Sequence, residues 1–336
     1  MSESPSGTMR ALILERPGCI ALREIPIPVP GPGELLIRVR AATTCGTDLK
    51  AFVRGHPQIP MPGVFGHEYS GVVAVAGSGA RFREGDAVMG VHSAPCQACS
   101  WCRRGQENLC ESIMATKVLG SFAEYLLIPE RIARLNVFLK PEDLSFERAS
   151  LLEPLSCVAE GVNHLGVAGE SRQRVLVIGA GAIGLMFAAV LRTHEVTVAG
   201  RNPSRVAVAQ QLGARTSSLE ALEADCFDVV IECTGSVDVW ERAPAHARRG
   251  GLVVLFGGCP SGTRASFDTA RLHYDQIALV SPFHFGTASV RRAREWLLEA
   301  QDAFGLVLTS ERPLDDGPEV FEGLRAGRDI KVVLRP

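Results

Sequence analysis

Three short segments of the chain carry side chains that could hold a reactive metal ion. Cys45 lies in CGTD, His67 and Glu68 lie in FGHE, and Glu153 lies in LLEPLSC. A thiolate, an imidazole and a carboxylate form a mixed donor set typical of catalytic zinc, which keeps one position for water or substrate. Taken singly, each residue has a structural alternative: Cys45 as a small buried residue, His67 as a core histidine, and the two glutamates as surface acids.

A denser group of cysteines follows, with the spacing C-x2-C-x2-C-x7-C, and consists of Cys96, Cys99, Cys102 and Cys110. Four thiolates so spaced can surround one tetrahedral zinc ion with no open position, which stabilises a loop and does no chemistry. The alternatives are an iron–sulfur cluster, although nothing else in the sequence indicates electron transfer, and disulfides, which are rare in cytosolic proteins. We expect one structural zinc in a lobe spanning about 93–113.

A glycine-rich segment is the third feature with chemical meaning. Gly179, Gly181 and Gly184 form G-x-G-x-x-G, with Ala182 and Ile183 between the last two glycines. The motif follows an apolar strand and opens a helix, which is the context that dinucleotide binding requires. The glycines permit a tight turn, close approach of a pyrophosphate, and tight packing of helix on strand. The alternative is a glycine-rich turn that binds no ligand.

The next predicted strand ends in Ala-Gly-Arg-Asn, where NAD sites usually have an acidic residue that binds the ribose. Here the carboxylate is missing at Gly200, and Arg201, Asn202 and Arg205 follow. Because a guanidinium pairs well with phosphate, we expect NADP(H) to be preferred through the two arginines, with NAD(H) as the alternative. In the structural alternative both arginines are solvated residues at the start of a helix.

Weaker cofactor candidates stand where later strands of the predicted sheet end. Thr234 follows one such strand and Gly257 another. A dinucleotide lies at the carboxyl ends of parallel strands, so both positions are expected to approach it.

Composition limits the kind of protein that holds these groups. The 336 residues correspond to about two domains at roughly 150 residues each, and 46% of them are apolar. With 35 basic and 37 acidic residues, the net charge of −2 argues against a nucleic-acid or anionic-membrane partner. The N-terminal sequence lacks the basic and apolar regions of a secretory signal. The longest uncharged stretch, 175–191, is shorter than the roughly 20 residues of a membrane span, so we expect a cytoplasmic protein.

The pattern of elements changes along the chain. The first third favours strands at 11–14, 36–41, 69–76 and 86–91 and shows weak helical periodicity, so it predicts a small barrel-like β domain. From about residue 146, continuous apolar runs alternate with helical stretches, as in successive βαβ units around a parallel sheet. These runs and helices are 175–178, 202–212, 227–231, 252–256, 277–280, 289–300 and a final strand at 330–334.

Taken together, these motifs resemble the zinc-dependent medium-chain dehydrogenases, the group of alcohol, sorbitol and threonine dehydrogenases. The matching segments follow family order from Met9 onward: PGPGE, CGTD, GHE, GD-x-V, the four cysteines, LLEPLSC, GAGAIG, ECTG and KVVL. The resemblance implies an α/β fold in which a GroES-like, β-rich catalytic domain accompanies a Rossmann domain with a doubly wound parallel sheet. We expect a flexible extension at 1–8, the catalytic domain at 9–149 and 287–336, and the Rossmann domain at 150–286.

The resemblance also implies roles for single residues. Cys45, His67 and Glu153 correspond to ligands of the catalytic zinc, and Glu68 is either a fourth ligand or a close acid. Thr47 matches the hydroxyl that passes the substrate proton onward. Asp48 is expected to orient the ligands, and Lys50 stands where many relatives have a histidine, which is a departure from the family pattern on the outer proton route.

The expected activity is the interconversion of a secondary alcohol, on a polyol, cyclitol or sugar alcohol, with its ketone. A threonine-like amino alcohol is the second candidate and an aldehyde the third. The chain is expected to bind two zinc ions, to take a small alcohol or ketone as substrate, and to form a homodimer or homotetramer, as the resemblance suggests. Two other hypotheses are a zinc-free reductase of the same fold and an NADP-binding protein without catalysis.

Overall fold

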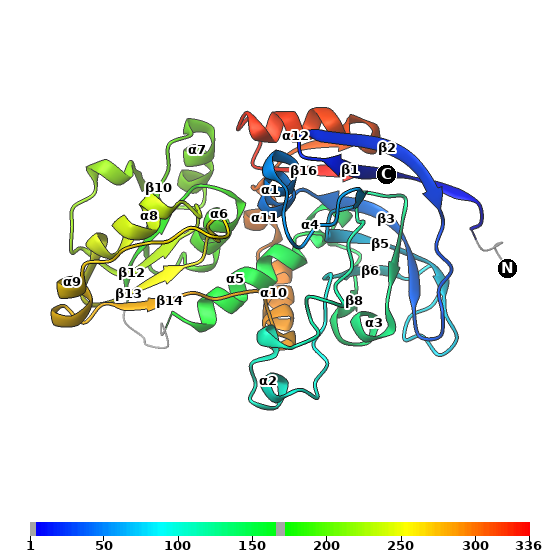
Figure 1. Ribbon diagram of the computed structural model, residues 1–336, viewed down its shortest axis with the longest axis horizontal. Helices are drawn as coiled ribbons and strands as arrows, with labels where there is room; N and C mark the ends of the chain where they lie inside the picture. The colour runs from blue at the N-terminus through cyan, green and yellow to red at the C-terminus, as the bar shows by residue number, and fades with distance from the viewer. Residues whose placement is uncertain (1–4, 166–171) are drawn as a thin grey trace. The chain divides into compact units, whose positions relative to one another are not determined.

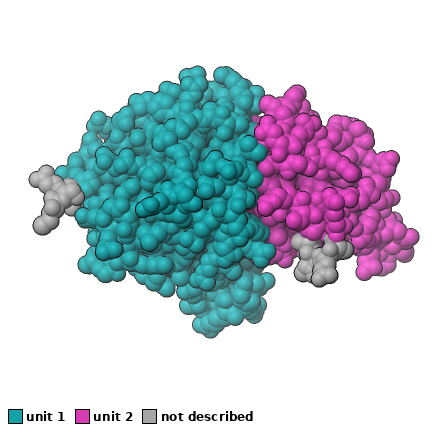
Figure 2. Space-filling view, turned by 180° about the vertical axis from the view of Figure 1, so that it is seen from behind, with its two compact units in different colours: residues 1–156, 285–336 teal, residues 157–284 magenta. Residues whose placement is uncertain are grey.

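The computed structural model describes residues 5–165 and 172–336 and divides into two compact units. Unit 1 comprises residues 1–156 and 285–336, and unit 2 comprises residues 157–284 (Figure 2). The domain boundaries predicted from the sequence fall after residues 149 and 286. Residues 1–4 of the expected extension lie outside the described residues, and strand β1 begins at Thr8.

Unit 1 is rich in antiparallel β structure, as predicted. A seven-stranded sheet has the order β15-β16-β3-β5-β6-β8, with β7 also paired to β3, and a three-stranded sheet has the order β2-β1-β4. All pairs are antiparallel except β15 with β16. The strands of unit 1 are β1 (Thr8–Arg16), β2 (Cys19–Pro26), β3 (Leu35–Thr43), β4 (Gly63–Val64), β5 (Glu68–Ala76), β6 (Ala87–Gly90), β7 (Tyr125–Ile128), β8 (Val137–Leu139), β15 (Leu308–Pro313) and β16 (Lys331–Arg335).

Alternation along β3 explains how this sheet holds a core. Ile37 and Val39 are buried, whereas Arg38 and Arg40 are exposed, because successive side chains of a strand point to opposite faces. The buried side joins a cluster that includes Phe65, with Phe122 and Phe321 packed against its ring. The last strand, β16, pairs with β3, so segments from the first and last parts of the chain build one sheet (Figure 1).

Helices interrupt the first third more than the sequence indicated. The helices of unit 1 are α1 (Gly46–Arg54), α2 (Ser100–Arg103), α3 (Glu130–Asn136), α4 (Phe146–Ala149), α10 (Thr287–Glu299), α11 (Gln301–Gly305) and α12 (Gly317–Arg325), and α5 (Leu152–Asn163) crosses the boundary between the units. The weak helical periodicity of the first third did not indicate α1, which is short and held by a reciprocal cap. Its N-cap is Cys45, and the Asp48 carboxylate accepts a hydrogen bond from the Cys45 N–H.

Unit 2 contains a six-stranded parallel sheet with the order β11-β10-β9-β12-β13-β14. The chain therefore leaves the central strand β9 first in one direction and then in the other, which is the doubly wound Rossmann order. Its strands are β9 (Arg174–Ile178), β10 (Glu195–Ala199), β11 (Arg215–Ser217), β12 (Phe227–Glu232), β13 (Ala247–Leu255) and β14 (Ala278–Val280), and its further helices are α6 (Ala182–Val190), α7 (Pro203–Gln211), α8 (Val237–Arg242) and α9 (Thr269–Tyr274).

The uncharged stretch at 175–191 forms β9 and α6, as predicted, and not one long helix. Among the described residues, no helix is both long and apolar enough to cross a membrane. The direction of winding reverses between β9 and β12, so the loops after these two strands lie at the switch point where doubly wound sheets bind ligands.

Candidate active site and metal centres

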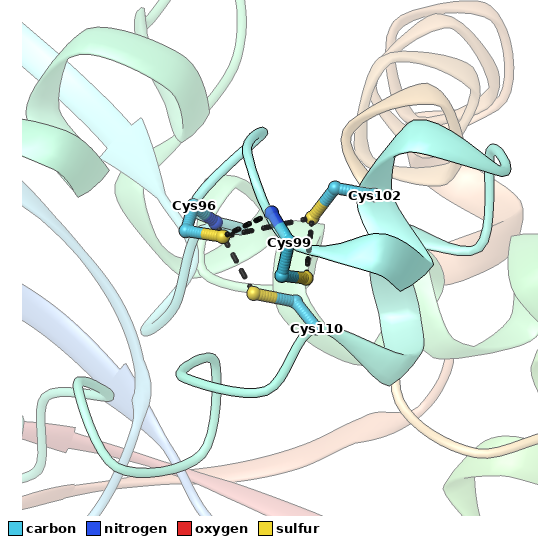
Figure 3. Close-up of side chains that lie close together, drawn as sticks. All are labelled: Cys96, Cys99, Cys102 and Cys110. Carbon is cyan, nitrogen blue, oxygen red and sulfur yellow. Dashed lines mark hydrogen bonds between the residues drawn. The ribbon is translucent and has the colours of Figure 1, made fainter.

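The four predicted cysteines of the lobe come together in unit 1. Their sulfurs all lie within 4.8 Å of one another, and Figure 3 shows them turned toward a common centre. Gln97, at a positive φ of 60°, makes the turn that aims the N–H groups of Ala98 and Cys99 at the Cys96 sulfur. All ten cysteines of the chain lie in the described residues, and all are free thiols.

Electrostatics indicate what a cation would stabilise in this cluster. The Cys99 and Cys102 sulfurs lie 3.5 Å apart, so adjacent thiolates would repel each other. Burial raises the pKa of Cys110, but N–H donation from Cys96 and the contacts of Ser112 outweigh it and lower the pKa to about 6. Four convergent sulfurs with no disulfide fit a closed tetrahedral zinc site.

The lobe that carries these cysteines is hydrogen-bonded to the C-terminal part of unit 1. Glu107, between the third and fourth cysteine, accepts a hydrogen bond from the Thr287 N–H at 2.9 Å and another from the Thr287 hydroxyl. Thr287 is the first residue of α10, whose opening N–H groups need acceptors. A zinc ion in the lobe would therefore hold the loop that caps α10.

The second group of predicted ligands lies at the ends of β3 and β5. One ligand atom each of Cys45, His67 and Glu68 lies within 4.8 Å of the other two. Cys45 caps α1 two positions after the end of β3, and Glu68 opens β5 opposite Thr43 of β3. Adjacent antiparallel strands thus bring together ligands that are separated by more than twenty residues.

Buried charge around this cluster is extensive. His67 is 7% exposed, Glu153 is 4% exposed, and Asp48 and Glu68 are completely buried. Asp48 Oδ1 lies 3.4 Å from His67 Nδ1. Burial lowers the pKa of His67, but the negative charges of Asp48 and Cys45 outweigh burial and raise the pKa well above its usual value. Asp48 therefore orients the ring and favours a cation at its far side.

Glu68 is bound on one oxygen only. Its Oε2 accepts hydrogen bonds from the Thr43 hydroxyl and the Lys331 ammonium, while its buried Oε1 has no hydrogen-bond partner among the residues that the structure describes. Burial raises the pKa of Glu68 to about 7, against the opposing charge of Lys331. An unpaired buried carboxylate oxygen beside a thiolate and an imidazole fits the donor set of zinc.

Glu153, the remaining predicted ligand, stands on the first turn of α5 outside this three-residue group. Its Oε1 lies 3.3 Å from His92 Nδ1, and its charge raises the pKa of Glu68. His92 stacks edge-on against His67 with ring centroids 5.0 Å apart. Burial, followed by His67 and Lys117, lowers the pKa of His92 well below its usual value.

The sequence offered no argument that places His92 or Lys331 at this site. For His92 the only signal is its position four residues before the cysteine cluster, and for Lys331 it is a lysine within the otherwise apolar run 330–334. Thr47 lies in the first turn of α1, and its N–H donates to the Cys45 sulfur at 3.4 Å. Lys50 lies on the same helix.

The glycine loop of unit 2 has the geometry that the motif predicts. A Cβ on Gly184 would lie 1.9 Å from the carbonyl oxygen of Gly179, so only glycine lets α6 approach β9 this closely. Gly179 adopts a positive φ of 113°, whereas a Cβ on Gly181 would meet nothing within 4 Å. The open space at Gly181, at the N-cap of α6, is where a pyrophosphate would approach free N–H groups.

A pocket of about 510 Å³ opens beside this loop. Most of the predicted cofactor residues line it, namely Gly179, Gly181, Gly200, Arg201, Asn202, Arg205 and Thr234. Four do not, namely Ala182, Ile183, Gly184 and Gly257. Gly257 contributes indirectly, because a Cβ there would lie 2.3 Å from the Gly235 nitrogen in the loop after β12.

Acidic residues in and beside this pocket were not predicted: Glu220 and Asp238 line it, and Glu232 lies next to the lining residue Cys233. Glu232 ends β12 fully buried, and its Oε1 accepts hydrogen bonds from the N–H groups of Thr234 and Gly235, which shapes the loop. Glu220 lies 3.5 Å from Arg242, and both line the pocket. Backbone N–H donation, followed by Arg242 and Arg201, lowers the pKa of Glu220.

The position that usually carries an acid in NAD sites has no room for one here. A Cβ on Gly200 would lie 2.9 Å from the Ala180 Cβ and 3.1 Å from Val206 Cγ2. Asn202 caps α7, with its Oδ1 accepting from the N–H groups of Ser204 and Arg205. The two arginines thus flank a capped helix start on one wall of the pocket.

A zinc-type site in a β-rich unit and a dinucleotide-type pocket in a Rossmann unit define a nicotinamide-dependent dehydrogenase. Comparisons with known proteins agree. Residues 31–137 match the alcohol dehydrogenase GroES-like domain, and residues 146–335 match the glucose dehydrogenase C-terminus. The chain belongs to the zinc-dependent medium-chain dehydrogenases and is an oxidoreductase that acts on CH–OH groups with NAD(P).

Individual relatives extend over most of the chain. L-Threonine 3-dehydrogenase from Deinococcus radiodurans is 31% identical over 97% of both chains. D-Altritol 5-dehydrogenase from Agrobacterium fabrum is 35% identical over 81% of this chain and 83% of its own. A structure described as a zinc-binding dehydrogenase from Sinorhizobium meliloti 1021 bound to NADP is 29% identical, with a TM-score of 0.86, and covers 98% of this chain and 100% of that chain.

Proposed function

We propose that this enzyme interconverts a secondary alcohol of a polyol-like substrate and its ketone, with zinc held by Cys45, His67, Glu68 and Glu153. The observation that carries the proposal is the buried Glu68 Oε1, without a hydrogen-bond partner in the described residues, beside the Cys45 and His67 donors. Zinc supplies Lewis acidity that makes an alcohol easier to deprotonate, and a nicotinamide accepts the hydride.

The chain's own residues supply orientation and proton movement in this proposal. Asp48 fixes the ring of His67 through its Nδ1 side, which leaves the other ring nitrogen for a metal. Thr47 receives the alcohol proton on its hydroxyl and passes it outward. Lys50 stands on the same helix as Thr47, in place of the usual histidine, so the outer part of this route needs solvent or Lys50 itself.

The names of two relatives support a secondary hydroxyl. The carbons that the names specify, carbon 3 of L-threonine and carbon 5 of D-altritol, both carry secondary alcohols. A panel of polyols, amino alcohols and aldehydes, followed by nicotinamide absorbance, tests the proposal. We expect the highest kcat/KM with a polyol. Exclusive turnover of L-threonine would replace the polyol with an amino alcohol, and turnover of aldehydes alone would reject both.

We further propose that NADP(H) is the preferred cofactor and that Arg201 and Arg205 bind its 2′-phosphate. Both line the pocket, and the neighbouring Gly200 leaves no room for a carboxylate that would repel the phosphate. Guanidinium groups bind phosphate through paired hydrogen bonds. The NADP in the Sinorhizobium meliloti structure is consistent with this choice.

Kinetics with both cofactors test this assignment. We expect kcat/KM to be higher for NADP than for NAD, and Arg201→Ala to reduce the value for NADP at least tenfold with little change for NAD. Arg264→Ala is the matched control, because Arg264 is exposed and does not line the pocket. A clear NAD preference in the unmodified enzyme would reject the proposal.

The oligomeric state is proposed to be a homodimer or homotetramer, by analogy with the family. Light scattering coupled to size-exclusion chromatography measures it directly, and a monomer would reject the proposal.

A further inference from the structure

A buried lysine stands behind the ligand cluster of unit 1. Lys331 opens β16, is 2% exposed, and is not itself a metal ligand. Its ammonium donates to Glu68 Oε2 at 2.5 Å and to the Thr44 carbonyl at 2.6 Å. Burying an ammonium group is costly unless it is paired and hydrogen-bonded, so both of these partners are needed to keep it there.

The sheet brings Lys331 to both ligand-bearing segments. Strand β16 pairs with β3, and β3 pairs with β5, where Thr43 stands opposite Glu68. Thr44 and Val332 exchange two further hydrogen bonds, from the Thr44 N–H to the Val332 carbonyl and from the Val332 N–H to the Thr44 hydroxyl. Because Thr44 directly precedes Cys45, Lys331 connects the backbone beside one ligand with the carboxylate of another.

The two oxygens of Glu68 consequently have different environments. Oε2 is occupied by the Lys331 ammonium and the Thr43 hydroxyl, and the Thr43 hydroxyl also accepts from the Ser150 hydroxyl at 3.3 Å. Oε1 is equally buried but has no hydrogen-bond partner among the described residues. Only Oε1 is therefore left to bind a cation.

Charge balance supports the same assignment. Four groups that can carry negative charge gather at this site, namely Cys45, Asp48, Glu68 and Glu153, and the Lys331 ammonium pairs directly with one of them, Glu68. A divalent ion offsets two of the four negative charges, and the ammonium offsets a third. Without Lys331, the metal would sit among ligands with an excess of buried negative charge.

We propose that Lys331 is a positioning residue for the catalytic zinc, which holds Glu68 as a one-oxygen ligand through Oε1 and ties it to the segment that carries Cys45. The inference rests on the proposed function, since it assumes that zinc occupies the Cys45–His67–Glu68 cluster. It adds that the C-terminal strand, far from every ligand in sequence, completes the metal site.

Zinc binding measured on the full chain tests this proposal without reference to turnover. We expect Lys331→Met to weaken the catalytic zinc by about tenfold or more in competition with a chelator, the size typical when support behind a ligand is removed. The zinc of the four-cysteine lobe should be retained and serves as an internal reference. Lys331→Arg should restore most of the affinity. Lys140→Met is the matched control, because Lys140 also donates to two backbone carbonyls but lies on another segment.

A double-mutant cycle with Glu68→Gln separates positioning from a merely structural role. If Lys331 acts through Glu68, Lys331→Met should weaken zinc binding far less in the Glu68→Gln background than in the unmodified chain. Equal losses in both backgrounds would overturn the proposal. If Lys331→Met alone does not fold, the double variant Lys331→Met/Glu68→Gln is used instead, because it no longer contains the buried carboxylate that lost its partner. Its zinc affinity is then compared with that of Glu68→Gln.

The visible spectrum of the cobalt-substituted enzyme gives a second readout. Lys331→Met should change the bands of cobalt at the catalytic site, since the mode of Glu68 binding changes, and leave those of the four-cysteine site alone. A folded Lys331→Met variant with unchanged zinc affinity and an unchanged cobalt spectrum overturns the proposed role of Lys331. If the unmodified enzyme still holds two zinc ions in that case, the proposed function is unaffected. One zinc ion per unmodified chain, held by the four cysteines, rejects the catalytic zinc site itself.

Discussion

Two glycines of the cofactor loop should respond in opposite ways to the same added methyl group. Gly181→Ala places a Cβ in open space at an ordinary φ of −85°, whereas Gly184→Ala places one 1.9 Å from the Gly179 carbonyl oxygen. Real Cβ contacts essentially never fall below 3.0 Å. At position 184 the helix α6 must therefore move by more than 1 Å away from β9, while at position 181 nothing in unit 2 has to move.

The sizes of the two effects follow from this geometry. Overpacking of a well-packed contact costs about 1–3 kcal/mol, and the clash at position 184 is with rigid backbone. We therefore expect Gly184→Ala to lower the free energy of unfolding by about 2 kcal/mol or more. At 181 the change in stability should stay within about 1 kcal/mol, since alanine restricts the unfolded chain but is a poorer N-cap. If the new methyl breaks one N–H bond to the pyrophosphate, the loss of about 1.5–3 kcal/mol corresponds to a roughly 10- to 150-fold weaker cofactor.

Urea unfolding and a fluorescence titration with NADPH measure both quantities on the same variants. The expected pattern is a stable Gly181→Ala variant that binds NADPH poorly and a clearly destabilised Gly184→Ala variant. Unchanged NADPH affinity in Gly181→Ala would refute the assignment of this loop to the pyrophosphate. Unchanged stability in Gly184→Ala would refute the close packing of α6 on β9.

Three further predictions concern other parts of the molecule. Burial, together with the positive charge of Arg242, lowers the pKa of His246, so the unfolded chain binds a proton more readily than the folded chain. Stability should therefore fall as the pH drops below about 6.5. Between pH 7.5 and 5.5, the urea midpoint of His246→Gln should fall less than that of the unmodified protein, and an equal fall in both contradicts this prediction. Cys102→Ser should release one zinc ion per chain and destabilise the protein, while two retained ions would exclude the four-cysteine site. Thr47→Val should lower kcat about 100-fold and Thr47→Ser much less, and equal rates would remove Thr47 from the proton route.

Local motifs allowed the sequence to predict much of the fold and part of the site. The glycine loop and the four cysteines each lie within one short segment, so their residues come close together without any long-range contact. The strand β9 and the helix α6 were predicted for the same reason. Helix α1 was missed although Asp48, three residues after Cys45, marks a reciprocal cap, because a cysteine is an unusual N-cap.

Long-range pairing explains what the sequence could not predict. Lys331 meets Glu68 across 263 positions, and this contact depends on the register of β16, β3 and β5. His92 reaches Glu153 and His67 only after folding, and it could equally have been a surface histidine. Glu232 belongs to the ECTG segment, but its role in shaping the loop after β12 is visible only from its backbone partners.

The most direct test of the zinc-dependent mechanism is a metal count on the purified enzyme and on Cys45→Ala, paired with alcohol-dependent reduction of the nicotinamide cofactor. Cys45 is one of the three clustered ligands and is absent from the four-cysteine lobe. We predict two zinc ions per chain in the unmodified enzyme, one in Cys45→Ala, and loss of nearly all turnover in the variant. A Cys45→Ala enzyme that keeps substantial activity with a single zinc ion would contradict the account.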